Sequence, residues 1–209
     1  SVLAVTAVAV VALAPRGESR AEAGQWLNFT GPGSGYAEVP NAPSLNPTAA
    51  ITMEAWIYLR SHDNFGAAPF CPTIAGKDFE EAYWFGVCSG RLRLIVRDAI
   101  TLDGTGTIPL DTWTHVAGVY DGSEMRLYIN AALDATKDIG AGAVGTSTDP
   151  LRIGNDVAWD ATPGGLLDEV RLWNVARTDM QIATTMTTTI ITPTAGLIAA
   201  WNFDGDTSD

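Results

Sequence analysis

Two alternating apolar runs joined by a tight turn constrain the fold of this 209-residue chain more than any other stretch. The runs cover residues 112–120 (TWTHVAGVY) and 124–130 (EMRLYIN), and Asp121, Gly122 and Ser123 lie between them. Side chains of a β-strand alternate between two faces, so this pattern predicts two antiparallel strands of one hairpin. Both faces of the first run carry apolar side chains, which indicates a strand in the middle of a sheet.

The composition is that of one folded domain with a sizeable core. Hydrophobic residues make up 46% of the chain and charged residues only 17%, which is too apolar for a disordered chain. The 12 basic and 24 acidic residues leave a formal charge of −12. Such a surface repels phosphate backbones, so we expect no nucleic-acid partner.

Further short apolar runs, separated by Gly- and Pro-rich turns, predict about a dozen strands. The runs are QWLNF, YAEVP, ITMEAWIYLR, PTIAGK, AYWFGV, RLRLIVR, ALDAT, LRIGND, LLDEVRLWN and GLIAAWNF. One short helix is predicted over residues 178–186, with Thr178 as its N-cap and Met180, Ile182, Ala183 and Met186 as its apolar stripe. These elements indicate an all-β, two-sheet antiparallel sandwich with one helix near the C-terminus.

Arg91, Arg93 and Arg97 alternate with apolar residues in RLRLIVR, so we expect them on one outer face of a sheet. They are either a solvated face balanced by nearby carboxylates or a patch that binds an acidic sugar or partner.

Cys71 and Cys88 are 17 positions apart, a spacing that suits a cross-strand disulfide. In an oxidising compartment, such a bridge would stabilise the fold by about 3 kcal/mol. The alternative is a pair of buried free thiols.

Residues 1–14 form an uncharged apolar run. As a helix it would extend about 21 Å, less than the roughly 30 Å of a bilayer core, so we expect no membrane span. One interpretation is a secretory leader cleaved near AEA at residues 21–23. The other is an assembly arm that adds a strand to a neighbouring subunit's sheet through Val2, Val5, Val8, Val10 and Val11. We therefore divide the chain into residues 1–23, a leader or arm, and residues 24–209, the sandwich.

Several stretches together resemble the laminin-G-like domains of the concanavalin A-like lectin/glucanase superfamily, found in bacterial and archaeal surface proteins. They are LNF, YAEVPNAPSLNPTAAITMEAWIYLRS, WTHVAGVYDGSEMRLYIN, LRIGND, GLLDEVRLWNVART and GLIAAWNFDGD, in the family's order over residues 25–206. The resemblance implies a jelly-roll sandwich in a secreted or surface-anchored protein. It implies much less about the ligand, because this fold carries lectins, adhesion modules and hydrolases.

The resemblance also implies a calcium site at one edge of the sandwich, where Asp168 and Asp204 match two of the family's acidic positions. A third position departs from the pattern, because Thr30 stands where relatives commonly have Asp. Fewer carboxylates would weaken such a site. The alternative places Asp168 at a strand end and Asp204 on the surface, without a metal.

The catalytic pattern of hydrolases with this fold is missing. Those enzymes place paired carboxylates on alternate positions of one strand, whereas Glu54 stands alone on its strand. Asp168 and Glu169 are adjacent, so regular alternation would send them to opposite faces. His115 lies inside the predicted central strand, where we expect it buried. We therefore predict that the chain is not an enzyme.

A loop tryptophan is the candidate ligand contact. Trp159 lies in NDVAWDATPGG, where an exposed indole flanked by Asp156 and Asp160 could stack on a sugar ring. The tryptophans in the predicted strands, among them Trp56, Trp113 and Trp173, are expected in the core or covering a sheet.

These features predict a non-catalytic extracellular module that recognises glycans or proteins. The alternative function is a self-assembling surface or filament subunit whose arm, residues 1–14, inserts into the next copy of the chain.

Overall fold

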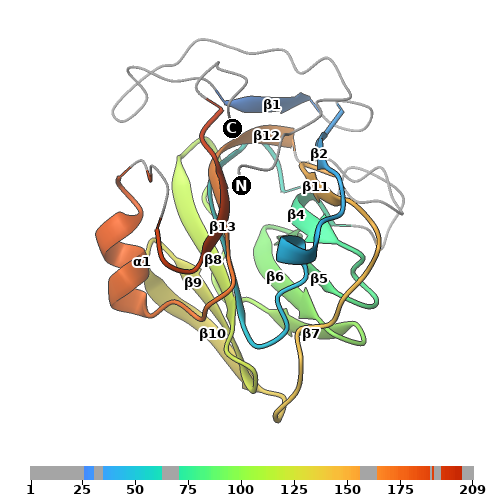
Figure 1. Cartoon of the computed structure of the whole chain (residues 1–209). Coiled ribbons are helices and arrows are strands. Elements are labelled where there is room, and N and C mark those ends of the chain that lie inside the picture. Colours follow the sequence, from blue (N-terminus) through green and yellow to red (C-terminus); the bar gives the residue numbers. More distant parts are fainter. Residues whose placement is uncertain are drawn as a thin grey trace.

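The computed structural model describes residues 26–30, 35–62, 71–155, 164–188, 190 and 194–203, and over this part the chain forms two antiparallel sheets packed face to face (Figure 1). Helix α1 (Asp179–Thr185) lies against the outer face of one sheet. A short 3₁₀ helix, η1 (Pro43–Leu45), precedes the strand β3. The two-sheet sandwich and the single short α-helix predicted from the sequence are confirmed.

The first sheet has seven strands in the order β1-β12-β3-β8-β9-β10, and β13 also pairs with β12. Their bounds are β1 (Leu27–Thr30), β12 (Gly164–Trp173), β3 (Ile51–Leu59), β8 (Thr114–Tyr120), β9 (Glu124–Ile129), β10 (Ala132–Asp138) and β13 (Leu197–Trp201). The second sheet has six strands in the order β2-β11-β4-β5-β6-β7. Their bounds are β2 (Ala37–Val39), β11 (Leu151–Ile153), β4 (Thr73–Lys77), β5 (Tyr83–Cys88), β6 (Arg91–Val96) and β7 (Ile100–Asp103).

One hydrophobic core fills the space between the two sheets. It is built by alternate residues of the strands, because every second side chain points inward. Ile51, Met53 and Ala55 of β3 belong to it, and so do Leu92 and Leu94 of β6. The intervening residues of each strand lie on an outer face, where any functional side chain must be sought.

The predicted hairpin is confirmed as β8 and β9. β8 lies between β3 and β9, and all seven of its residues are buried, as expected for a central strand. On its outer face, Ala117 and Val119 contact Tyr128 of β9 and Ile182 of α1. Tyr128 is buried although its neighbours on that face of β9 are partly exposed, because α1 covers it.

Helix α1 begins at the predicted N-cap. The Thr178 side chain accepts a hydrogen bond from the Gln181 amide, and the Gln181 side chain accepts one from the Thr178 amide, which makes a capping box. The predicted apolar stripe is wrong, however, because Met180 is 76% exposed and Ala183 is also exposed. Within the helix only Ile182 is buried. Apolar burial therefore contributes little to holding α1 on the sheet.

The predicted arginine face is wrong for Arg97, because the strand ends before this residue. Arg97 has a φ of 24° in the turn between β6 and β7, a strand that the sequence analysis missed. Its guanidinium donates to the carbonyls of Ile139 and Gly140. Arg93 stays on the outer face and pairs with Asp103 of β7 at 2.6 Å. A carboxylate therefore balances the outer face at Arg93, as one of the two alternatives predicted.

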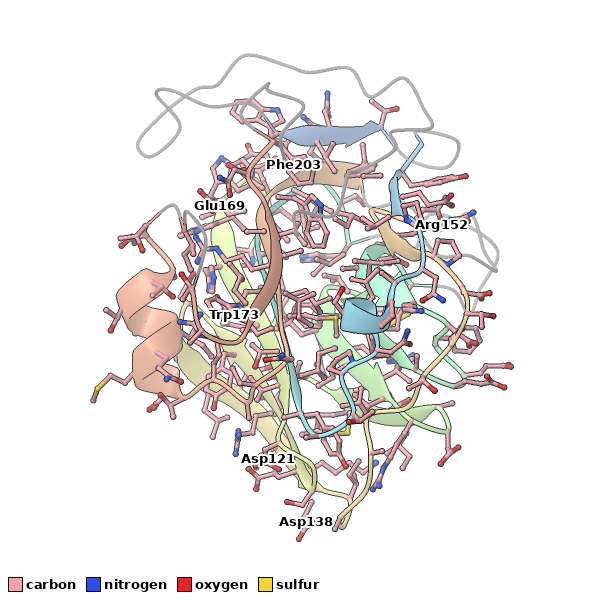
Figure 2. The ribbon with its side chains drawn as sticks, viewed as in Figure 1. Asp121, Asp138, Arg152, Glu169, Trp173 and Phe203 are labelled. Atoms are coloured by element: carbon pink, nitrogen blue, oxygen red, sulfur yellow. A yellow bond between two sulfur atoms is a disulfide. The ribbon has the colours of Figure 1, made fainter. Side chains whose placement is uncertain are left out.

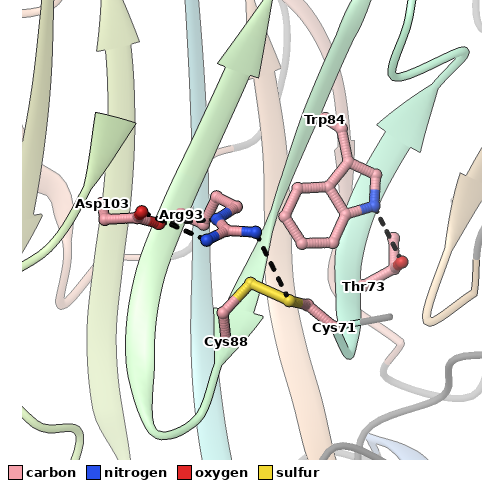
Figure 3. The surroundings of a disulfide bond; sticks show 6 residues. All are labelled: Cys71, Thr73, Trp84, Cys88, Arg93 and Asp103. Carbon is pink, nitrogen blue, oxygen red and sulfur yellow. Dashed lines mark hydrogen bonds and ion pairs between the residues drawn. A yellow bond between two sulfur atoms is a disulfide. The ribbon is translucent and has the colours of Figure 1, made fainter. Parts of the chain in front are cut away.

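The predicted disulfide is confirmed between Cys71, just before β4, and Cys88 at the end of β5 (Figure 3). Arg93 lies beside it, with Nη1 3.8 Å from the Cys71 sulfur. Next to the bridge, the Trp84 indole lies across the sheet and donates to Thr73 Oγ1 at 2.9 Å. The disulfide joins two neighbouring strands of the six-stranded sheet.

Residues 1–25 lie outside the described part of the chain. The interpretation of residues 1–14 as a leader or as an assembly arm, with its valines 2, 5, 8, 10 and 11, therefore stays a prediction. Neither described helix has the length to traverse a bilayer.

Candidate functional site

The outer face of the seven-stranded sheet carries two groups of side chains that the core does not use. The first is a buried ionic group beneath α1, which we call the α1 network: Glu54, His115, Glu169, Arg171 and Arg177. The second is a group of rings farther along the same face, which we call the aromatic cluster: Trp26, Tyr58 and Trp113.

Glu54 is the centre of the α1 network. It lies on β3 with its side chain fully buried, and it accepts a hydrogen bond from Arg177. Its other oxygen, Oε2, lies 3.8 Å from Arg171 Nη1 and 3.7 Å from His115 Nε2. Arg171 also pairs with Glu169 at 2.9 Å. The two carboxylates and two guanidiniums balance in charge, as buried ions require.

Both arginines of the network also bind the end of α1. Arg171 donates to the carbonyls of Thr185 and Thr188, and Arg177 donates to the Gln181 carbonyl and the Thr185 hydroxyl. Carbonyls at a helix C-terminus lack partners within the helix and carry partial negative charge, so cations are favoured there. Side-chain polar contacts, rather than Ile182 alone, therefore hold the helix on the sheet.

The α1 network is poorly suited to catalysis. Burial raises the pKa of Glu54 above its ordinary value, against the opposing attraction of Arg177 and Arg171. Both oxygens of this carboxylate face protein cations beneath α1, so a substrate has no access to them. His115 is 1% exposed, which confirms that it is buried. We assign the network to positioning α1.

A β-bulge changes the expected geometry at Asp168 and Glu169. Asp168 pairs with Trp56 and Arg171 pairs with Glu54, so two residues of β12 oppose one residue of β3. Glu169 has a φ of 51°, and its carboxylate contacts Arg171. The bulge interrupts the regular alternation on which the expectation of opposite faces for Asp168 and Glu169 rests. Figure 2 shows Glu169 and Trp173 marking the stretch of β12 that carries this part of the network.

The rings of the aromatic cluster come from three places in the chain. Trp26 precedes β1, Tyr58 lies on β3, and Trp113 directly precedes β8. The centroid of Trp113 lies 6.0 Å from that of Trp26 and 5.8 Å from that of Tyr58. Trp26 is 4% exposed and packs with Leu166 of β12, whereas Tyr58 and Trp113 are partly exposed. Solvent therefore reaches two aromatic rings on this face.

Polar and aromatic side chains extend the cluster along β3. On one side, Arg60 Nη1 donates to the Asn28 side-chain carbonyl at 2.9 Å. On the other side, the partly exposed Trp56 donates its indole N–H to the Met186 carbonyl at 2.7 Å. The Trp56 ring also lies edge-on to His115, with centroids 5.4 Å apart. Rings beside a few placed polar groups are typical of small-molecule binding sites.

The ligand contacts predicted from the sequence stay predictions. Trp159, Asp156 and Asp160 lie outside the described residues, as does Asp204. Asp168 is described, and its Oδ1 accepts the Glu169 amide at 2.8 Å. Within the described ranges, no group of three or more His, Cys, Asp or Glu side chains is placed to hold a metal ion. The calcium site at Asp168 and Asp204 stays a prediction.

The aromatic cluster was missed as a candidate site, although the sequence contained a signal for it. Trp56 and Tyr58 lie on the face of β3 opposite its core residues, so alternation alone places two rings on an outer face. The contact between Trp26 and Trp113 could not be predicted from the sequence, because these residues are distant in the chain and the strand order alone brings them together.

Over the described residues, two antiparallel sheets and one short α-helix form a jelly-roll sandwich of the concanavalin A-like kind. The chain belongs to the concanavalin A-like lectin/glucanases superfamily, since the model of that family matches residues 30–183. The resemblance found in the sequence is thereby confirmed.

The chain is also similar to one curated protein and to solved structures of the same fold. Mouse pappalysin-1 is 32% identical over 130 residues, which are 58% of this chain and 8% of that protein, so the chain spans a small part of its relative. Domain 4 of the extracellular arabinanase AbnA of Geobacillus stearothermophilus, solved with arabinotriose, has a TM-score of 0.62 at 18% identity, with coverage of 85% of this chain and 81% of that one. A Bacteroides ovatus protein assigned to carbohydrate binding has a TM-score of 0.64 at 23% identity, with coverage of 75% and 46%.

Proposed function

We propose that the chain is a non-catalytic module that binds glycans through the aromatic cluster. The observation that carries the proposal is the pair of partly exposed rings, Tyr58 and Trp113, fixed against the nearly buried Trp26. Aromatic faces suit the apolar faces of sugar rings, and rings already held in place lose little freedom on binding.

Two further observations support this function. Glu54, the carboxylate nearest the cluster along β3, is enclosed by Arg177 and Arg171 and is therefore unsuited to general acid or base work. Structural neighbours of this fold include a domain solved with arabinotriose and a protein assigned to carbohydrate binding. The disulfide and the family favour an extracellular setting for the module.

The test is a glycan array followed by calorimetry on the whole chain. We expect wild type to bind at least one glycan class, Trp113→Ala to weaken that binding tenfold or more, and Tyr36→Ala to leave it unchanged. Tyr36 is the matched control, since it is a partly exposed ring that stacks on Arg152 at 4.2 Å on the six-stranded sheet.

An array without any bound glycan, or equal binding by wild type and Trp113→Ala, would overturn the proposal. Repeating the assay with calcium and with a chelator tests the separate prediction for Asp168 and Asp204. If chelation weakens binding, removal of either carboxylate should do the same.

A further inference from the structure

We propose that the site contains two ring-binding subsites along β3, one at Tyr58 and Trp113 and the other at Trp56, so that its ligand is an oligosaccharide chain rather than a single terminal sugar. This inference rests on the proposed function and adds the size and direction of the ligand.

The spacing of the rings supports two subsites. Trp56 and Tyr58 are two positions apart on β3, so both lie on the outer face, with Cα atoms about 7 Å apart. In the register of the sheet, Trp56 pairs with His115, and Trp113 is two residues before His115 on the neighbouring strand. The rings therefore form a row along the strand instead of a single stack. A row of partly exposed rings offers contacts to successive sugar units.

Trp56 is held in one orientation without a ligand. Its indole N–H is bonded to the Met186 carbonyl, and its ring lies edge-on to His115 at an interplanar angle of 70°. Met186 is the C-cap of α1, and the α1 network fixes that end of the helix through Arg171 and Arg177. The helix thus acts as a positioning element for the second subsite.

Polar groups at the other end of the row give the site a direction. Arg60 directly follows β3, two positions after Tyr58, and its guanidinium donates to the Asn28 side chain. Asp111 is exposed, and its amide donates to the Leu59 carbonyl, so its backbone lies beside this end of β3. Guanidinium, amide and carboxylate groups can bond sugar hydroxyls at this end. The chain of sugars would run from this end, over Tyr58 and Trp113, to Trp56.

The test measures affinity against ligand length. Arabino-, xylo-, cello- and manno-oligosaccharides of increasing length, from the monosaccharide upward, are titrated into the whole chain by calorimetry. In the series that binds, we expect affinity to rise at least tenfold with length and then level off. Trp56→Ala should reduce binding of the longer ligands to that of the shorter ones, while Trp113→Ala weakens both.

Controls separate the second subsite from loss of folding. Trp56→Phe keeps a ring but loses the bond to Met186, so it should bind long ligands better than Trp56→Ala. Tyr36→Ala should match wild type. Affinity that does not depend on length, or an equal loss for short and long ligands in Trp56→Ala, would overturn the two-subsite inference and leave glycan binding intact. If none of the four series binds, the two-subsite inference fails, whereas the proposed glycan binding fails only if the glycan array also shows no bound glycan.

Discussion

Glu54 and Arg177 form a buried ion pair beneath helix α1, although they are 123 residues apart in the sequence. Glu54 comes from the middle of β3, and Arg177 comes from the segment that leads into α1. The Arg177 guanidinium also lies over the Trp173 ring, 4.1 Å from its centroid. One arginine thus ties the helix to the sheet through charge, hydrogen bonds and a stacked ring.

We predict that Arg177→Met destabilises the protein by about 3 kcal/mol near neutral pH, because it leaves the Glu54 charge buried without its closest partner. Burial already raises the pKa of Glu54 above its ordinary 4.5, and loss of Arg177 raises it further. A raised carboxyl pKa means that the folded state binds the proton more tightly than the unfolded state does. The stability that this proton binding contributes is present in acid and is lost as pH rises. Urea unfolding should therefore show a smaller penalty near pH 5 than near pH 7.5.

Arg152→Met provides the matched control for this prediction. Arg152 pairs with Glu38 at 2.9 Å, but both side chains are partly exposed, so its loss should cost under about 1 kcal/mol. If Arg177→Met costs no more than Arg152→Met, the α1 network does not hold the helix.

Alternation and turn chemistry predicted most of the strands, the hairpin and the start of α1, because these features depend on residues close together in sequence. The same alternation puts Glu54 on the face of β3 opposite its core residues. It could not find Arg177 as its partner, since that contact depends on how α1 packs on the sheet. The bulge at Asp168 and Glu169 could not be predicted from the sequence either, because a bulge adds one residue without changing the apolar pattern around it.

The candidate site shows the same division. Alternation along β3 predicts that Trp56 and Tyr58 lie on an outer face of the sheet. Their solvent exposure cannot be predicted in this way, because it depends on which other residues cover each ring. Met180 shows the converse case, since helical spacing placed it in an apolar stripe and the structure leaves it 76% exposed. A helix of seven residues that is held by arginines needs only one buried apolar side chain, Ile182.

Loss of the disulfide should lower stability without changing the fold. Cys71 and Cys88 close a loop of 17 residues, and in the chain-entropy model the bridge contributes about 3 kcal/mol. Reduction, or replacement of both cysteines by serine, should shift the urea midpoint accordingly while circular dichroism stays the same. Loss of the sandwich spectrum on reduction would contradict this expectation, because the core between the sheets does not include the bridge.

Asp121 should contribute to acid sensitivity. Partial burial acts to raise its pKa, but the Glu124 and Ser123 amides, the Ser123 hydroxyl and Arg126 outweigh it, so the pKa lies below its ordinary 3.8. Asp121 lies at the end of the sandwich opposite Phe203 (Figure 2). A lowered carboxyl pKa gives stability that is present above the unfolded pKa and is lost as pH falls through the folded one.

Asp121→Asn should therefore be less stable than wild type near neutral pH, by roughly 1 kcal/mol, and the difference should shrink below about pH 4. Thermal unfolding across this range measures it. Asp138→Asn is a suitable control, since that carboxylate also bonds one loop amide, that of Gly140, and lies at the same end of the sandwich. A difference between Asp121→Asn and wild type that does not change with pH would argue against a role for its charge.

Tyr83 should limit stability in alkali. Its ring lies in the core on β5, its hydroxyl donates to the Leu45 carbonyl at 3.0 Å, and burial raises the pKa of the phenol far above its ordinary value. The unfolded chain loses this proton near pH 10, while the folded chain keeps it, so the contribution of Tyr83 is fully present below that pH and is lost as pH rises. Above about pH 10, the unfolded chain therefore gains stability relative to the folded one as pH rises.

Tyr83→Phe should lower the free energy of unfolding by about 1 kcal/mol at neutral pH, because the Leu45 carbonyl loses its partner. Above about pH 10, the free energy of unfolding of the variant should fall less steeply with pH than that of wild type, so that the two stability curves converge. Tyr120 and Tyr128, whose pKa values burial also raises, remain in both proteins and cancel in the comparison. Parallel losses of stability in wild type and variant would show that the Tyr83 phenol does not control the alkaline limit.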